Sequence, residues 1–196
     1  MDKPPPDTKL EMRDYIDHDT LRDGRKVIVR AIRPDDKALL QEGMQHLSTQ
    51  SQYFRFFTHK EFLSEKELQY FTEMDFVKHV ALFAGFDENG QFSPAATGRY
   101  IVTTAETARE GTISPENVSA EIAVTVVEEF QGLGFATILL KHLIKIARLQ
   151  SVQEFKGTVL PGNQRMLNLV TRSGLPCKQI LNDTGEWEIT LLLGTA

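Results

Sequence analysis

Apolar and polar residues alternate along several short stretches of the chain, a pattern typical of half-buried β-strands. The first is Lys26 to Ile32, where Val27, Val29 and Ala31 alternate with polar or exposed positions. Further strands are expected over residues 79–87, 95–104, 118–127 and 154–160, and in a terminal pair around 177–181 and 187–193. The turn signal Asn89-Gly90 predicts that the strands at 79–87 and 95–104 form an antiparallel hairpin.

Helical patterns and capping signals separate these strands. Arg33 to Asp36 places proline and acids where a helix N-terminus favours them, so a helix is predicted over 37–47. Ser64 opens a second helix, with a glutamate three residues later. A long apolar-striped helix is expected from Phe135 to Gln150, and a last one over 164–173. The order β-α-α-β-β-β-α-β-α-β-β predicts a mixed α/β (α+β) domain.

Composition fits one globular domain over residues 21–196, preceded by a polar, acidic, proline-bearing arm over 1–20. We expect this arm to be partly disordered, with Glu11 to Ile16 as a candidate edge strand. The single cysteine, Cys177, excludes an intramolecular disulfide and a four-cysteine metal site. With no signal peptide and no apolar run of membrane-spanning length, we expect a cytoplasmic protein without a membrane partner.

Several other classes of function lack support. A net charge of -5 argues against a nucleic-acid partner, because such binding depends on lysine and arginine neutralising phosphates. The five histidines form no i,i+4 pair and no metal spacing, so no metal is predicted. No serine lies in a G-x-S-x-G turn, which leaves a hydrolase triad without support.

The turn between the strand at 118–127 and the long helix is unusually rich in glycine. Its residues Gln131 to Ala136, QGLGFA, open a helix N-terminus, where bare main-chain N–H groups and a partial positive charge favour an anion. A P-loop would need a lysine followed by serine or threonine after Gly134, so it is excluded. A dinucleotide fingerprint would need a third glycine at Thr137, and the antiparallel strand pattern argues against it. A helix-start turn that binds nothing is the remaining alternative.

Two motifs in this order resemble the GNAT superfamily of N-acetyltransferases. Gln131 to Ala136 resembles its Q/R-x-x-G-x-G/A signature, and Asn163 to Leu175 is similar to its N-x-x-A-x-x-L-Y-x-K-x-G-F helix. The segments SQYFRFF, RAIRPDD and AEIAV further look like bacterial protein-lysine acetyltransferases. The resemblance covers about residues 21–193. It implies a GNAT fold, with a mostly antiparallel twisted sheet of six to seven strands, splayed in the middle and flanked by about four helices.

The resemblance also implies how acetyl-coenzyme A is held. Main-chain N–H groups of Leu133 to Thr137 would surround the pyrophosphate, with the Gln131 amide beside them. The strand at 118–127 would follow the pantetheine arm, freed from its neighbour by a bulge. Asn163 matches the asparagine that bonds the arm, and a helix N-cap is an equally good interpretation of it. The expected cofactor-binding residues are Ile122, Val124, Val126, Gln131, Gly132, Leu133, Gly134, Phe135, Ala136, Thr137 and Asn163.

Acetyl transfer to an amine needs a base, because a lysine-like amine has a pKa near ~10.4. Glu121 matches the glutamate proposed as base in the lysine-acetyltransferase branch, and a desolvated cleft can raise a carboxylate pKa. Strand alternation puts Glu121 on one face with Ala123 and Thr125. The alternative is an ordinary solvent-facing glutamate.

The protonation of the leaving thiolate is the weak point of the resemblance. Val170 stands where the family usually has a tyrosine general acid, and valine cannot donate a proton. Either water, Ser173 or another hydroxyl protonates the thiolate, or the protein is a coenzyme A-binding module without efficient turnover.

The favoured function is acetyl-coenzyme A-dependent N-acetylation by direct attack of the amine, with a protein lysine as acceptor. A small amine such as a polyamine, an amino acid or an aminoglycoside is an alternative acceptor, and a non-catalytic acyl-coenzyme A sensor is an alternative function. A homodimer is compatible with the sequence. We expect the aromatic group at 53–62 to be mainly core, with a place at the acceptor mouth near Arg55 as the alternative; it comprises Tyr53, Phe54, Phe56, Phe57 and Phe62.

Overall fold

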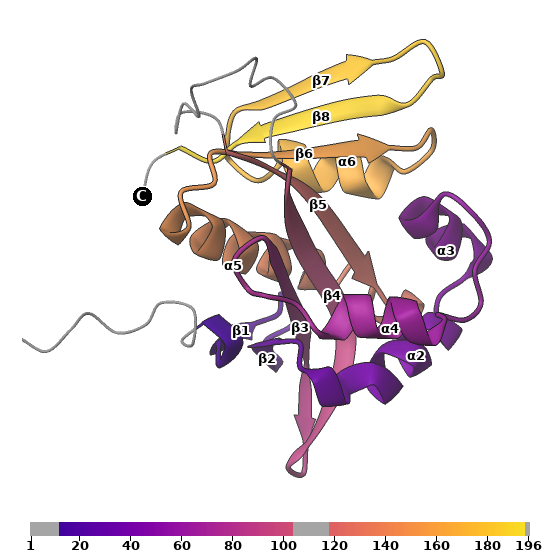
Figure 1. Cartoon of the computed structure of the whole chain (residues 1–196), viewed down its shortest axis with the longest axis vertical. Helices are drawn as coiled ribbons and strands as arrows, with labels where there is room; N and C mark the ends of the chain where they lie inside the picture. The colour runs from indigo at the N-terminus through magenta and orange to yellow at the C-terminus, as the bar shows by residue number, and fades with distance from the viewer. Residues whose placement is uncertain (1–11, 104–117, 195–196) are drawn as a thin grey trace, which may run out of the picture.

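A single eight-stranded sheet forms the centre of the computed structural model, which describes residues 12–103 and 118–194 (Figure 1). The strand order is β1-β2-β3-β4-β5-β6-β8-β7, and every pair of neighbours is antiparallel except the parallel pair β5–β6. The strands are β1 Ile16–Thr20, β2 Lys26–Ala31, β3 His79–Glu88, β4 Gln91–Thr103, β5 Ser119–Val126, β6 Glu154–Val159, β7 Cys177–Leu181 and β8 Trp187–Leu192. Residues 1–11, part of the arm expected to be partly disordered, lie outside the described residues.

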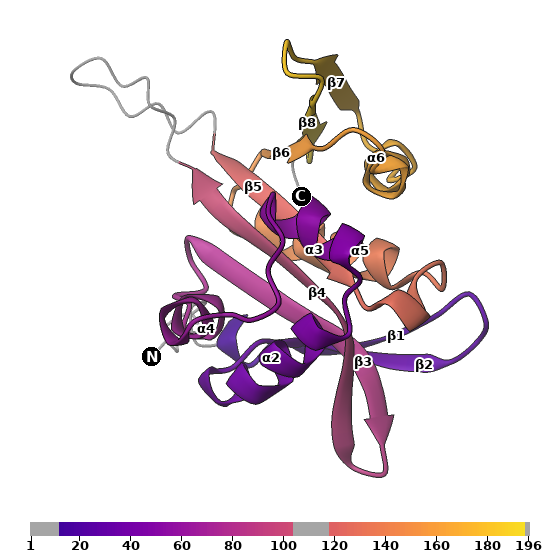
Figure 2. The same ribbon diagram turned by 90° about the vertical axis from the view of Figure 1, so that its right-hand side faces the viewer.

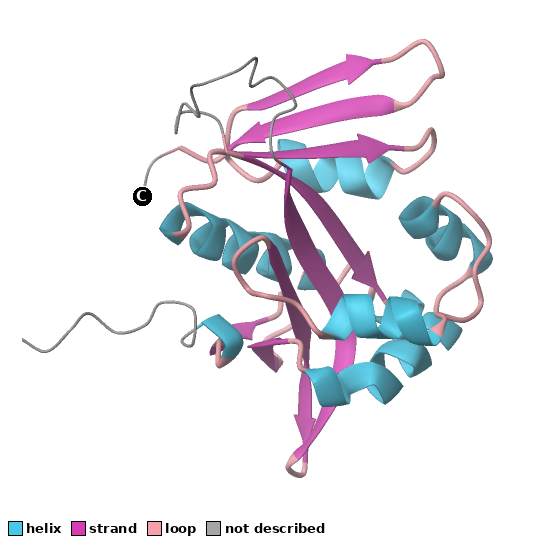
Figure 3. Cartoon of the chain, viewed as in Figure 1, coloured by secondary structure: helices cyan, strands magenta, loops and turns pink. Residues whose placement is uncertain are grey.

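Helices cover both faces of this sheet (Figures 2 and 3). The α-helices are α2 Lys37–Gln45, α3 Thr49–Phe56, α4 Glu65–Thr72, α5 Phe135–Leu149 and α6 Gln164–Thr171, with short 3₁₀ turns at Pro34–Asp36 and Glu128–Phe130. Helix α5 packs on one face of β3, β4 and β5, whereas α2, α3 and α4 lie over the opposite face (Figure 2). In residues 12–103 and 118–194, no helix has both the length and the apolar character that a membrane crossing requires.

The predicted fold class is confirmed, but both element counts were too low. The sheet has eight strands instead of six to seven, and the described residues contain five α-helices instead of about four. The extra strand is β1, whose sequence IDHDT is too polar to stand out. Asp17 and Asp19 of β1 face α5, where they pair with Lys145 and Lys141 at 3.2 and 2.9 Å. The candidate edge strand at 11–16 was therefore placed too early. The extra helix, α3, begins at the N-cap Ser48.

Helix α5 sits close to the sheet because β4 carries a glycine beneath it. A Cβ atom on Gly98 would lie 3.0 Å from Leu143 Cδ1 and 3.3 Å from Leu139 Cβ. The C-terminus of α5 is bonded to β4 through its C-cap, Gln150, whose side chain accepts a hydrogen bond from the Tyr100 hydroxyl at 2.7 Å. The position of α5 fixes where its N-terminus meets β5.

Replacing Gly98 with valine should push α5 away from β4. We expect the free energy of unfolding to fall by about 1–3 kcal/mol, the usual cost of overpacking a core. Urea denaturation measures this, with Gly43→Ala as the control, because a Cβ on Gly43 in α2 meets nothing within 4 Å. The control should raise stability by up to about 1 kcal/mol. Wild-type stability in Gly98→Val would show that α5 does not rest on this glycine.

Candidate active site

Strands β5 and β6 separate in the middle of the sheet. They pair only where Ser119, Ala120 and Glu121 face residues 154–156, and beyond Glu121 the two strands diverge (Figure 1). The predicted splay is therefore present. The bulge expected in β5 is absent, since its pairing with β4 runs without a register shift from Ser119 to Val126. The sheet opens on the β6 side of β5 instead.

The splay leaves main-chain groups of β5 without a strand partner. In an antiparallel ladder, successive residues point their N–H and C=O groups alternately toward one neighbour and the other. The Val127 N–H donates to the Ala95 carbonyl, so Val127 points its main-chain groups toward β4. By alternation, Ile122, Val124 and Val126 point their N–H and C=O groups to the other side, toward β6. These are the three β5 residues predicted to bind the cofactor.

The turn before α5 presents a second set of free donors. No side chain of the described chain caps the start of α5, and the first intrahelical bond runs from Ile138 N–H to the Gly134 carbonyl. The N–H groups of Phe135, Ala136 and Thr137 therefore have no partner within the helix. Gly134 has φ 110°, a left-handed conformation that disfavours any side chain. The turn can bind an anion through its backbone alone.

Gln131 has a structural task at this turn. Its side-chain amide donates to the Val126 carbonyl at 3.1 Å and to the Ser51 hydroxyl at 3.3 Å. Glu128, in the 3₁₀ turn before Gln131, accepts hydrogen bonds from the hydroxyls of Ser48 and Ser51 at 2.5 and 2.9 Å. Burial, which would raise the pKa of Glu128, is outweighed by these hydrogen bonds, so its pKa lies below the ordinary value. Both side chains hold the N-terminus of α3 against the turn.

Besides Arg55, four basic side chains line the same cleft, and the sequence predicted no role for them. They are Arg22, Lys141, Arg165 and Arg172. Arg22 comes from the β1–β2 turn, and its side chain would lie 3.6 Å from a Cβ atom on Gly134. The main-chain N–H of Arg22 donates to the Leu133 carbonyl at 3.4 Å. Arg165 and Arg172 lie within the motif at 163–175, whereas Arg22 and Lys141 lie outside both motifs, so only the fold brings the four together.

Helix α6 forms the other wall of the cleft. Asn163 caps this helix, with its side-chain oxygen accepting from Met166 N–H at 3.1 Å, so the N-cap interpretation is confirmed. Val170 is fully buried in a small cluster with Val159 and Ile189, facing away from the cleft. Ser173 does line the cleft, although its hydroxyl donates to the Val170 carbonyl at 2.7 Å.

Glu121 lies at the apex of the splay, on the face of β5 that α3 covers. Its side chain is exposed, so the protein alone does not supply the desolvation expected around it. A bound cofactor and acceptor would have to exclude water there. Glu121 lines the cleft together with the β5 backbone, the turn before α5 and Asn163, so the fold brings the predicted site residues into one cleft of about 830 Å³. The exception is Leu133, which does not line the cleft and packs against the core instead.

The aromatic segment at α3 is mostly not core, which corrects the sequence-based expectation. Tyr53, Phe57 and Phe62 are 49%, 47% and 61% exposed. Phe54 and Phe57 line the cleft, and Phe56 packs over the interior between α3 and the sheet. The short helix has one face toward the cleft, because α3 is held to the turn by Glu128 rather than buried in the core.

Comparison with known proteins identifies the family. The model of the acetyltransferase (GNAT) family matches residues 44–175, which is more than half of the chain. The chain belongs to the GNAT acetyltransferase family. This GNAT protein is therefore an N-acetyltransferase that uses acetyl-coenzyme A and an amine-bearing acceptor.

Individual relatives point to the same family. The GNAT protein is 28% identical over 156 residues to Acetyltransferase PA5475 of Pseudomonas aeruginosa, covering 80% of this chain and 78% of the relative. It is also 28% identical to Acetyltransferase Pat of Mycolicibacterium smegmatis, covering 79% of this chain but only 42% of that longer protein. The GNAT domain of S. lividans PAT is a solved structure with a TM-score of 0.78 and 33% identity, covering 90% and 96% of the two chains.

The residues of the cleft fit acetyl-coenzyme A. Free N–H groups at Phe135 to Thr137 and a bare Gly134 suit a diphosphate, and the basic side chains nearby suit an anionic ligand. The open edge of β5 offers donors and acceptors for the amides of the pantetheine arm. Both features follow from main-chain geometry, which explains why few charged residues mark the site in the sequence.

A side chain on Gly134 should block the diphosphate and strain the backbone. We expect Gly134→Val to weaken acetyl-coenzyme A binding by about tenfold or more, as calorimetry would measure. The matched control is Gly185→Val in the β7–β8 turn. Gly185 also has a positive φ, but its added Cβ would meet nothing within 4 Å. The control should keep wild-type affinity. Equal affinity in Gly134→Val and the wild type would place the diphosphate elsewhere.

Proposed function

We propose that this GNAT enzyme acetylates the side-chain amine of protein lysines, with Glu121 as the base. The observation that carries the proposal is the placement of an exposed carboxylate at the apex of the β5–β6 splay, beside the exposed aromatic residues of α3. An extended polypeptide can reach such an open mouth, whereas an enclosed pocket would suit a small amine. The resemblance of the segments SQYFRFF, RAIRPDD and AEIAV to bacterial protein-lysine acetyltransferases supports a protein acceptor.

The proposed chemistry assigns each step to a residue of this chain. Acetyl-coenzyme A supplies an activated acetyl thioester. The N–H groups of Leu133 to Thr137 hold its diphosphate, with Asn163 and the β5 edge orienting the arm. Glu121 accepts the proton of the attacking amine, directly or through one water. The N–H groups of Ile122 or Val124 are aimed at the side where negative charge develops on the carbonyl oxygen.

The departing thiolate takes its proton from water or from Ser173. Val170 is apolar and buried, so it takes no part. Cys177 is not among the residues that line the cleft, which favours direct attack over an acyl-enzyme. Direct transfer needs only that cofactor and acceptor are bound together at the splay.

A thiol-release assay with acetyl-coenzyme A tests the acceptor class. The panel contains lysine-bearing proteins and peptides, polyamines, amino acids and an aminoglycoside. We expect turnover on proteins and peptides, with acetyl-lysine detected by mass spectrometry. Turnover only on small amines would contradict the protein acceptor, and cofactor binding without any thiol release would favour a sensor.

Removing the base should lower turnover without weakening the binding of acetyl-coenzyme A. We expect Glu121→Gln to reduce kcat by about a hundredfold or more, since a general base contributes about 10²–10⁴ in rate. Its dissociation constant for acetyl-coenzyme A should stay within about twofold of the wild type. Glu188→Gln on β8 is the control, because Glu188 is also an exposed strand glutamate but does not line the cleft. Unchanged kcat in Glu121→Gln would exclude this base.

A further inference from the structure

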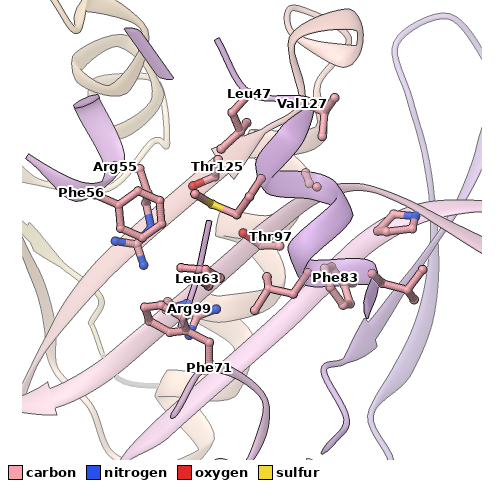
Figure 4. A pocket seen from close by; sticks show the side chains of 16 residues that line it. Leu47, Arg55, Phe56, Leu63, Phe71, Phe83, Thr97, Arg99, Thr125 and Val127 are labelled. Carbon is pink, nitrogen blue, oxygen red and sulfur yellow. The ribbon is translucent and has the colours of Figure 1, made fainter. Parts of the chain in front are cut away.

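Arg55 and Arg99 lie close together between helices α3 and α4 and the sheet, next to Glu121, the proposed base. Arg99 projects from the middle of β4 and is only 4% exposed, and Arg55 projects from α3. Both line an interior cavity of about 50 Å³, where Figure 4 shows the two guanidinium groups near the rings of Phe56 and Phe71. The Arg99 guanidinium lies 4.3 Å from the Phe71 ring centroid, and that of Arg55 lies 5.0 Å from the Phe56 centroid.

Neither arginine of this pair forms an ion pair within the part of the chain that the structure describes. Among residues 12–103 and 118–194, neither guanidinium has a carboxylate oxygen within 4.0 Å, in contrast to Arg30, whose buried guanidinium bonds Asp36 at 2.7 and 2.8 Å. Arg99 has a polar side-chain contact with His79 Nε2, at 3.3 Å. Burial lowers the pKa of His79 to about 4, so this ring is neutral at physiological pH and supplies no negative charge.

Such an arrangement is electrostatically unfavourable without an anion. Burial, followed by repulsion from Arg55, lowers the pKa of Arg99 to about 9. Burial also lowers the pKa of Arg55, and the negative charge of Glu121 offsets this only in part. Buried cations usually have a bonded counter-ion, because charge removed from water is costly. A carboxylate between the two guanidinium groups would remove this cost.

The cluster is contiguous with the proposed reaction centre. Arg99 pairs with Ala123 across the β4–β5 ladder, so Arg99 and Glu121 are diagonal neighbours on the same sheet face. Arg55 lines both the interior cavity and the large cleft that contains Glu121. A cavity of about 50 Å³ holds a few water-sized groups, which is enough for a carboxylate. The diphosphate turn lies at the far end of β5 from Glu121, so this cluster faces the acceptor rather than the phosphates.

We propose that Arg55 and Arg99 form an anion subsite that recognises a carboxylate of the acceptor, the side chain of a glutamate or aspartate near the modified lysine. This inference rests on the proposed function, in which a protein lysine reaches Glu121. Arg55 is the residue that the acceptor meets first, and Arg99 supplies the buried half of the subsite. The pair therefore selects lysines in an acidic sequence context.

Matched peptides test this preference. Two acetyl-capped peptides carry one lysine each and differ only in a glutamate or a glutamine beside it. For the wild type, kcat/KM should be about tenfold or more higher with the glutamate peptide, equivalent to about 1.4 kcal/mol. In Arg55→Gln the two values should agree within about twofold, whereas acetyl-coenzyme A affinity is unchanged. Arg33→Gln, the same change at an exposed arginine outside both cavities, should keep the wild-type preference.

A second readout separates failure of this inference from failure of the proposed function. A lysine-free glutamate peptide is titrated into the protein while the Arg55 and Arg99 side-chain Nε–H signals are followed by NMR. Shifts of both signals, absent with the glutamine peptide, support the subsite even if no peptide is acetylated, in which case only the protein-lysine function fails. Absence of shifts, or equal kcat/KM for the two peptides in the wild type, would overturn the subsite.

Discussion

The divergence of β5 from β6 is the constraint on which the rest of the site depends. A sheet normally satisfies its main-chain groups by pairing, and a strand that loses its partner must find others. Here the loss begins directly after Glu121, so the same break frees the β5 backbone and exposes the carboxylate. The α5 N-terminus adds unpaired donors at the end of the same strand. One topological feature thus places the donors proposed for the cofactor and the carboxylate proposed as base in one cleft.

Electrostatics within the cleft run against the charge of the whole protein. The chain carries a net charge of -5, yet basic side chains such as Arg22 and Lys141 line the cofactor half of the cleft. Arg55 and Arg99 make the acceptor half positive as well. Local fields of this kind concentrate anionic ligands at a site. Among the described residues that line the cleft, Glu121 is the acidic exception.

Much of this could be predicted from sequence because it depends on local patterns. The two glycines of the turn, the alternation of β5 and the capping signal at Ser64 each require only a few neighbouring residues, and the structure has the corresponding elements. Strand β1 escaped prediction because IDHDT is polar and is stabilised by partners on α5, more than 120 positions away. The same holds for Arg22 and for the burial of Arg99, which depend on contacts that no local pattern records.

The aromatic segment of α3 shows a different limit. Hydrophobic composition alone favours core for Tyr53 and Phe57, yet both are about half exposed. What decides their position is the tie from Glu128 to Ser48 and Ser51, a contact between segments about 80 residues apart. Exposed aromatic side chains beside a cleft fit contact with a partner better than core packing.

A crystal structure of the protein with acetyl-coenzyme A tests the central claim most directly. The account predicts the diphosphate within hydrogen-bonding distance of the N–H groups of Leu133 to Thr137, and the arm along the open edge of β5 at Val124 and Val126. A diphosphate bound away from the α5 N-terminus, or an arm that leaves the β5 edge uncontacted, would contradict it.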